Sequence, residues 1–193
     1  MMKKTIFCMV LGFFISGCFG GYSPTSRFYK LQTESNLTAV STKKFSLGIE
    51  EVTLPDYLDK PQIIVMEENS PQMSISELHR WGEPLESMIR RTVVADMALL
   101  LPEAMVKSQV LLSERFDYLV EIQIVRFDMI AGQKAVLEAW WYLYGANGQT
   151  LYRRKVTLEE PIGNSFDDYV SAESKMLAEM SQTMAETISA KVK

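Results

Sequence analysis

The chain has 193 residues and a formal net charge of −4, which becomes −6 if Lys3 and Lys4 are removed with a leader peptide. One domain of this length can bury a substantial hydrophobic core. The acidic balance gives no support for nucleic-acid binding, which needs a basic surface. One histidine and two cysteines exclude the usual zinc and iron clusters.

The N-terminus has the three parts of a bacterial lipoprotein signal. Lys3 and Lys4 are followed by an almost entirely apolar run over residues 5–15 and then by Ser16-Gly17-Cys18. We expect cleavage between Gly17 and Cys18, a diacylglycerol on the Cys18 thiol and an acyl group on its amine, because two or more chains hold a protein firmly to a bilayer. The apolar run is short for a transmembrane helix. The alternatives are an ordinary secretory signal with a chance cysteine, or an uncleaved anchor.

The residue after Cys18 predicts the destination of the lipoprotein. In enteric-type sorting an aspartate there retains the protein in the inner membrane, and this chain has Phe19. We therefore expect the outer membrane, with the domain facing the periplasm. Residues 18–26 contain Gly20, Gly21 and Pro24 and predict a flexible tether, so the folded domain is expected over residues 27–193.

Periodicity predicts several strands and two helices in this domain. Alternating or continuous apolar residues indicate strands over residues 27–31, 45–54, 62–67, 72–75, 117–130, 134–144 and 151–158. Apolar residues three and four apart indicate helices over residues 83–101 and from Asn164 or Ser165 to the C-terminus. Phase changes predict bulges near Glu51 and between Ile124 and Arg126.

The last three strands are predicted to form a meander. Asn147-Gly148 favours a type I′ hairpin turn between the second and third of them. The expected fold class is α/β of the α+β type, a two-layer sandwich in which two amphipathic helices pack on a mainly antiparallel sheet.

The residues offer little chemistry. A Ser-His-Asp hydrolase would have to use His79, but the sequence has no Gly-x-Ser-x-Gly nucleophile motif. Adjacent carboxylates on a strand point to opposite faces, so such pairs do not converge on a substrate. We expect no enzyme activity, no metal site and no cofactor other than the covalent lipid on Cys18.

Two segments favour recognition of a partner. Prolines bracket Tyr57 and Leu58 in the segment 54–63, and Trp81 precedes the first helix in the segment 80–85. The alternatives are that Tyr57 and Leu58 fold back on the core and that Trp81 only staples the helix start. The candidate partner-binding residues are Pro55, Asp56, Tyr57, Leu58, Arg80 and Trp81.

These two segments also carry a family resemblance. Leu54–Val65 and Arg80–Leu85, together with Phe28-Tyr29-Lys30-Leu31 and the lipoprotein signal, resemble the ABC-type transport auxiliary lipoprotein family and its PqiC (YmbA-like) branch. The resemblance covers essentially the whole chain, and the two motifs together are fairly specific.

The resemblance implies a non-enzymatic periplasmic subunit. Its implied partners are MCE-domain proteins of the PqiB type, whose hollow assemblies are thought to move lipids between the two membranes. A homo-oligomeric ring is plausible, because symmetric partners favour matching symmetry. Two other functions stay open: a lipid-binding carrier with a sizeable apolar cavity, and an outer-membrane assembly lipoprotein.

Overall fold

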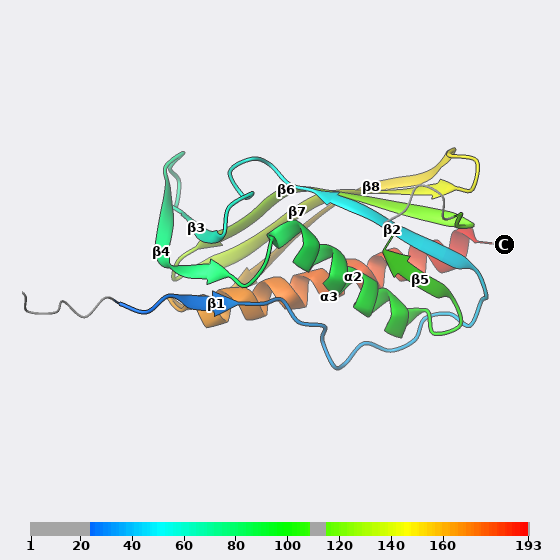
Figure 1. Cartoon of the computed structure of the whole chain (residues 1–193), viewed down its shortest axis with the longest axis horizontal. Coiled ribbons are helices and arrows are strands. Elements are labelled where there is room, and N and C mark those ends of the chain that lie inside the picture. The colour runs from blue at the N-terminus through cyan, green and yellow to red at the C-terminus, as the bar shows by residue number, and fades with distance from the viewer. Residues whose placement is uncertain (1–23, 109–114, 193) are drawn as a thin grey trace, which may run out of the picture.

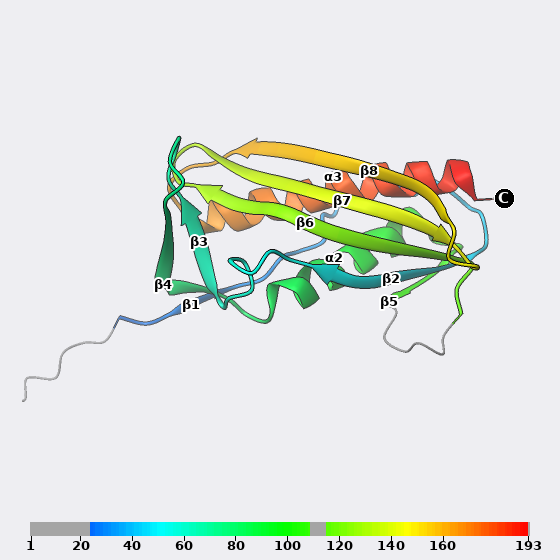
Figure 2. The ribbon, with the colours of Figure 1, turned by 90° about the horizontal axis from the view of Figure 1, so that it is seen from above.

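The computed structural model describes residues 24–108 and 115–192. Over these residues, eight strands form one mixed sheet and two helices cover one of its faces (Figures 1 and 2). The elements in chain order are β1 (Arg27–Tyr29), β2 (Ser46–Thr53), β3 (Gln62–Met66), β4 (Met73–Trp81), α2 (Leu85–Leu100), β5 (Met105–Ser108), β6 (Tyr118–Ile130), β7 (Lys134–Gly145), β8 (Thr150–Pro161) and α3 (Phe166–Lys191).

The long strand β6 organises the sheet. One of its edges pairs with β7, which pairs in turn with β8. The other edge is divided between β2, which pairs near the start of β6, and β3, which pairs near its end. β5 extends the sheet beyond β2, and β4 and then β1 extend it beyond β3. The two predicted bulges are confirmed as register shifts, between Ile49 and Val52 and between Ile124 and Arg126.

The prediction of a mainly antiparallel sheet is confirmed only in part. The β6–β7–β8 meander and the β3–β4 hairpin are antiparallel, whereas β2 and β3 both run parallel to β6. The β1–β4 and β2–β5 pairs are parallel as well. Parallel partners need long crossovers, so local turn signals do not reveal them. The sequence patterns also missed β5, whose four residues give too short a run to show a period.

The hairpin between β7 and β8 differs from the expected type I′ turn. Gly148 has a φ of 78°, whereas Asn69 is the only described non-glycine residue with a positive φ. Gly148 donates its N–H to the Gly145 carbonyl at 2.8 Å, and the register shifts between Leu143 and Tyr144. This is the arrangement in which a type I turn is followed by a left-handed glycine and a bulge, so Asn147 need not adopt a positive φ.

Both helices bury the predicted stripes. Pro84 directly precedes α2, and the hydroxyl of Ser165 caps α3 by accepting a hydrogen bond from the Asp168 N–H at 3.0 Å. Their apolar side chains fill the space between helices and sheet in one cluster with the inward residues of β6 and β7. The buried stripe residues are Leu85, Met88, Ile89, Val93, Met97 and Leu100 in α2, and Tyr169, Ala172, Met176, Met180, Met184 and Ile188 in α3.

One carboxylic acid, Asp96, is enclosed where α2 meets α3. It is 0% exposed and accepts a hydrogen bond from the Ser181 hydroxyl at 3.1 Å. Burial raises the pKa of Asp96 to about 6, and the hydrogen bond offsets only part of this effect.

We expect Asp96 to make the protein less stable as the pH rises from about 4 to about 6. In this window the folded chain keeps a proton that the unfolded chain has released. Asp96→Asn should remove the part of the fall that this carboxyl causes and raise the free energy of unfolding at neutral pH by about 1–2 kcal/mol. Urea denaturation across this range measures both effects, and an unchanged pH dependence in the variant would contradict the assignment.

Candidate functional site

The structure places the two recognition segments side by side. Gln62, at the start of β3, is in register with Arg80 near the end of β4. The Trp81 N–H donates to the Pro61 carbonyl at 2.7 Å, and the Gly82 N–H donates to the Tyr29 carbonyl at 2.7 Å. A Cβ on Gly82 would lie 3.2 Å from that carbonyl oxygen, so the close approach of the two backbones favours glycine. Segments about twenty residues apart in the sequence thus form one continuous surface.

An open groove of about 290 Å³ runs between the two segments. Its floor is apolar, because Trp81 and Leu85 are buried to 4% and 3% exposure. Its rim is polar and includes exposed Asp59 and Lys60. A partner side chain that enters the groove could therefore rest on an apolar floor and find charges of both signs at the rim. The lining residues are Asp59, Lys60, Pro61, Trp81, Gly82, Glu83, Pro84 and Leu85.

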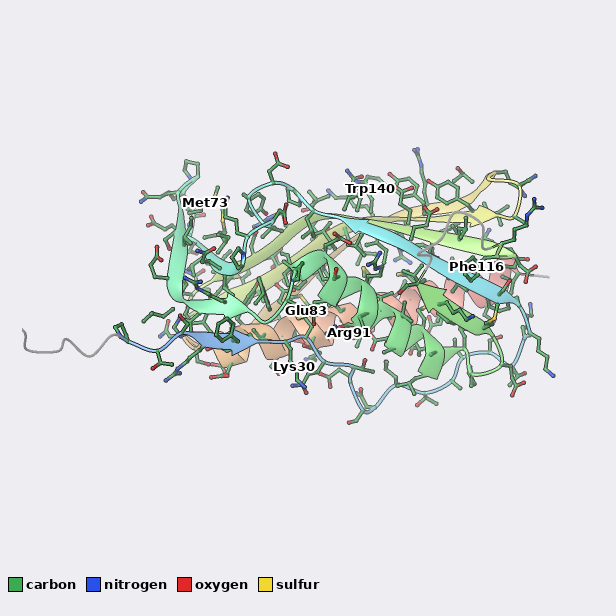
Figure 3. All side chains as sticks on the ribbon, in the orientation of Figure 1. Lys30, Met73, Glu83, Arg91, Phe116 and Trp140 are labelled. Carbon is green, nitrogen blue, oxygen red and sulfur yellow. The ribbon has the colours of Figure 1, made fainter. Side chains whose placement is uncertain are left out.

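An ion pair fixes one wall of the groove. The Arg91 guanidinium donates two hydrogen bonds to the Glu83 carboxylate, and Figure 3 shows both side chains beside α2. Hydrogen bonding from Arg91 lowers the pKa of Glu83. The bond ties the residue before Pro84 to the second turn of α2, and a fork-to-fork Arg–carboxylate pair also holds its geometry.

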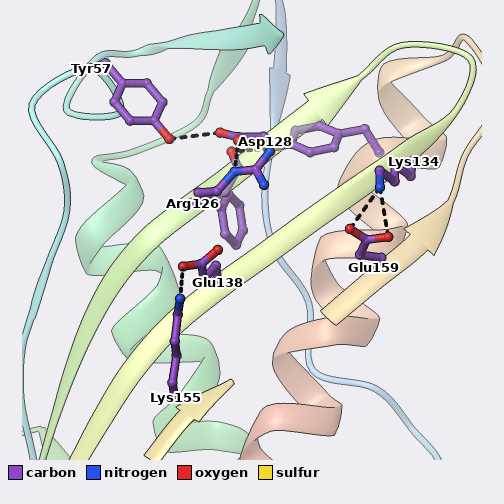
Figure 4. A network of polar contacts seen from close by, with 9 residues as sticks. Tyr57, Arg126, Asp128, Lys134, Glu138, Lys155 and Glu159 are labelled. Carbon is purple, nitrogen blue, oxygen red and sulfur yellow. Dashed lines mark hydrogen bonds and ion pairs between the residues drawn. The ribbon is translucent and has the colours of Figure 1, made fainter. Parts of the chain in front are cut away.

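The proline-bracketed segment is held down on the sheet. The Tyr57 hydroxyl donates to Asp128 Oδ1 at 2.9 Å, and Arg126 Nε donates to Asp128 Oδ2 at 2.7 Å (Figure 4). Burial and the Asp128 carboxylate raise the pKa of Tyr57 far above its usual value. The bulge that precedes Arg126 lies on the stretch of β6 between its pairings with β2 and β3, where Tyr57 reaches the sheet.

Tyr57 and Leu58 therefore do not form an exposed recognition surface. Leu58 is 4% exposed and belongs to the core, and Tyr57 is half-buried against it. The alternative that these side chains fold back on the core is confirmed. The Tyr57 hydroxyl thus ties this segment to β6 between the pairings of β6 with β2 and β3.

Trp81 is also buried, and it packs on the core side of the groove. Its ring centroid lies 6.1 Å from those of Phe127 and Tyr169, which are 6.4 Å from each other. Trp81 thus offers little surface to a partner. Of the other candidates, Asp56 is exposed, and Pro55 and Arg80 are half-buried. Gly17 and Cys18 lie outside the described residues, so the cleavage and lipid site stays a prediction.

Of the eight residues that line the groove, only Trp81 was among the predicted site residues. The charged residues Lys60 and Glu83 were missed, and so was Arg91, which pairs with Glu83. Lys60 and Glu83 stand inside the two motifs, next to residues that were chosen for their apolar character. Arg91 had a weaker signal. It is eight residues from Glu83 in the sequence, so its contact with Glu83 could be predicted only if the start of the helix were known.

The histidine has a structural role. His79 Nδ1 lies 3.0 Å from the Ser76 hydroxyl, and the ring stacks on Phe166 at the start of α3 with centroids 3.8 Å apart. Among the described residues, no group of three or more His, Cys, Asp or Glu side chains could hold a metal ion. In the same part of the chain, no helix is long and apolar enough to cross a membrane.

Removing one oxygen tests the anchoring of the loop. We expect Tyr57→Phe to lower the free energy of unfolding by about 1–2 kcal/mol, because a part-buried hydrogen bond to a charged group is lost. Urea denaturation measures the change. Tyr142→Phe on β7 is the matched control and should shift stability by less than about 0.5 kcal/mol. Equal effects of both variants would show that the Tyr57 hydroxyl does not hold the loop.

This chain belongs to the family of ABC-type transport auxiliary lipoprotein components, whose family model matches residues 29–185. It is 28% identical over 155 residues to the intermembrane transport lipoprotein PqiC of Escherichia coli K12, with 79% of each chain covered. The resemblance seen in the two motifs is thus confirmed.

Solved structures agree on the fold. A crystal structure of an uncharacterized protein has a TM-score of 0.72 and 25% identity, and the match covers 86% of this chain and 99% of the other. A crystal structure of a Xanthomonas campestris protein has a TM-score of 0.67 and 16% identity, with 86% and 96% covered.

Proposed function

We propose that this chain is an outer-membrane-anchored periplasmic lipoprotein and the accessory subunit of an MCE-type intermembrane lipid transport system, where it docks the transport tube. The observation that carries the proposal is that both family motifs line one groove. The similarity to a protein named intermembrane transport lipoprotein supports the kind of system. The docking role needs no catalytic residue.

The groove suits a protein segment better than a lipid. Pockets for whole small molecules usually start at about 300 Å³. The groove, at about 290 Å³, lies at this lower limit and holds one or two side chains. Its mixed rim charges, from Asp59, Lys60 and the Glu83–Arg91 pair, fit a polar interface edge around an apolar centre. The contiguous cluster of side chains between helices and sheet does not favour the lipid-carrier alternative.

The lipid on Cys18 would raise the local concentration of this groove at the membrane. We expect Cys18→Ser to remain an uncleaved precursor without lipid, because the thiol that accepts the diacylglycerol before cleavage is absent. Mass spectrometry of the purified protein measures this, and Ser23→Ala in the tether is a control that keeps the lipid. A cleaved and acylated Cys18→Ser protein would contradict the lipoprotein signal.

A pull-down from native membranes in mild detergent, followed by mass spectrometry, tests the docking function. MCE-domain subunits should co-purify with the unsubstituted chain. Lys60→Glu on the groove rim should reduce their recovery at least several-fold, because a reversed rim charge repels a fitted partner. Lys107→Glu on β5 changes the same charge at another exposed site and should not.

Two results would overturn the proposal. Recovery of barrel-assembly or lipopolysaccharide components in place of MCE-domain subunits would favour the assembly-lipoprotein alternative. Equal recovery with both lysine variants would place the docking surface outside the groove. A photo-crosslinking amino acid at position 60 would then fail to reach the partner as well.

A further inference from the structure

One end of the domain carries most of the exposed apolar side chains. β4 crosses this end, and the chain leaves it through β1 toward the N-terminus (Figures 1 and 2). Among the described large hydrophobic residues, Phe28 on β1 is 67% exposed, and Met73 and Ile75 on β4 are each 45% exposed. Figure 3 shows Met73 at the tip of the β3–β4 hairpin.

A slip in the strand register places these side chains on one face. Gln62 pairs with Arg80, yet Ile64 pairs with Ile75, so β4 contains three more residues than β3 between the two pairs. Directly paired residues share a face of the sheet, and so do residues two apart in one strand. Ile75 therefore lies on the face of Arg80, and so does Phe28, which pairs with Arg80 from β1.

The position of the tether makes this end the one nearest to the lipid. The described chain begins at Pro24, six residues after Cys18. Six extended residues span at most about 20 Å. With acyl chains on Cys18, β1 is thus held within one tether length of the bilayer. Met73, two residues before Ile75, shares its face and this end of the molecule.

We propose that the β1–β4 end lies on the lipid bilayer and that Phe28, Met73 and Ile75 enter the boundary between headgroups and acyl chains. An aromatic and two long aliphatic side chains gain from leaving water at that depth. Exposed Arg27 and Lys30 flank Phe28 and can reach lipid phosphates while their stems stay apolar. The long axis of the domain then points away from the membrane, with the C-terminal end of α3 farthest from it (Figure 1).

This contact is driven by apolar area more than by charge. Exposed Glu77 lies on the same strand as the patch, so the end is not uniformly basic. We therefore expect little dependence on anionic lipid. The proposal rests on the lipid at Cys18 but not on the docking of a transport partner.

Depth-dependent quenching tests the contact. The chain from Cys18 onward has one thiol, since Cys8 lies in the leader. That thiol can be coupled to a maleimide lipid in vesicles of phosphatidylethanolamine and phosphatidylglycerol, with or without brominated acyl chains. Phe28→Trp and Ile75→Trp each add a tryptophan to the patch, and the unsubstituted chain gives the background of the three native ones.

Bromine should quench roughly a third or more of the added fluorescence in Phe28→Trp and Ile75→Trp, because both side chains reach the acyl boundary. The control is Leu99→Trp, which is equally accessible at 50% exposure but lies at the C-terminal end of α2. It should show no quenching above background. No quenching at positions 28 and 75, or equal quenching at position 99, would overturn the proposal.

The outcome is independent of the transport function. The vesicles contain no partner protein, and the chemical coupling replaces the natural lipid. A failed quenching test would therefore leave the docking proposal intact, and a failed pull-down would leave the bilayer contact intact.

Discussion

Replacing Glu173 by glutamine should stabilise the protein at neutral pH. Glu173 lies in α3, is 0% exposed, and neither of its carboxyl oxygens has a hydrogen-bond partner. The Tyr169 hydroxyl donates to the Phe127 carbonyl at 3.0 Å. Burial, reinforced by the Asp128 carboxylate, raises the pKa of Glu173 well above its usual value. Folding must therefore protonate this group.

The sign of the pH dependence follows from the raised pKa. From the ordinary pKa of a glutamate up to that of folded Glu173, the folded chain holds one more proton than the unfolded chain. Stability then falls by about 1.4 kcal/mol for each pH unit. Glutamine resembles the protonated acid in shape and stays neutral, so Glu173→Gln should remove the fall.

Urea denaturation as a function of pH isolates this effect when both chains carry Asp96→Asn, since Asp96 otherwise adds its own fall in stability up to about pH 6. Glu179→Gln, an exposed change on the same helix, is the matched control and should leave the slope as it is. A slope that survives in Glu173→Gln would show that another group carries the proton.

The second large effect is expected at Trp81. Trp81→Ala should lower the free energy of unfolding by about 3–5 kcal/mol, because a buried indole packed between Phe127 and Tyr169 leaves a cavity. Trp140→Ala removes the same side chain from the half-buried, helix-free face of β7 and should have a clearly smaller effect. Thermal unfolding of both variants measures the difference.

This comparison also separates folding from recognition at the groove. If Trp81→Ala were as stable as the unsubstituted chain and still lost its partner, Trp81 would act as a contact residue. The expected outcome is loss of both, with Lys60→Glu losing only the partner. The motif around Trp81 would then maintain the structure of the groove floor, while the residues at the groove rim contact the partner.

Local patterns predicted both helices and the long strands well, because each of these elements has a strong one-dimensional signal. The stripe of α3, the cap at Ser165 and both bulges follow from periods and phase changes that short windows contain. The family resemblance could be predicted because each of its two motifs is a contiguous run of residues. These signals do not depend on what lies across the sheet.

The remaining features depend on contacts between distant segments. The burial of Leu58 requires the open stretch of β6, about seventy residues away, and the hydrogen bond from Tyr57 to Asp128 spans the same separation. The strand order and the parallel pairs of β2 and β3 with β6 arise in the same way. Glu173 was hidden because a glutamate in a helix pattern normally indicates a solvated position.

The divided edge of β6 has a consequence for how the polypeptide can be made. β2 with β5, and β3 with β4 and β1, are separate strand groups that β6 joins into one sheet. The strands before residue 118 therefore keep unpaired edges until the last two fifths of the chain, from β6 onward, have been made. A prematurely terminated product that stops after β5 would consist of two unjoined ribbons without α3, with little apolar surface enclosed. The hydrophobic core can therefore close only after β6, β7 and α3 have been made.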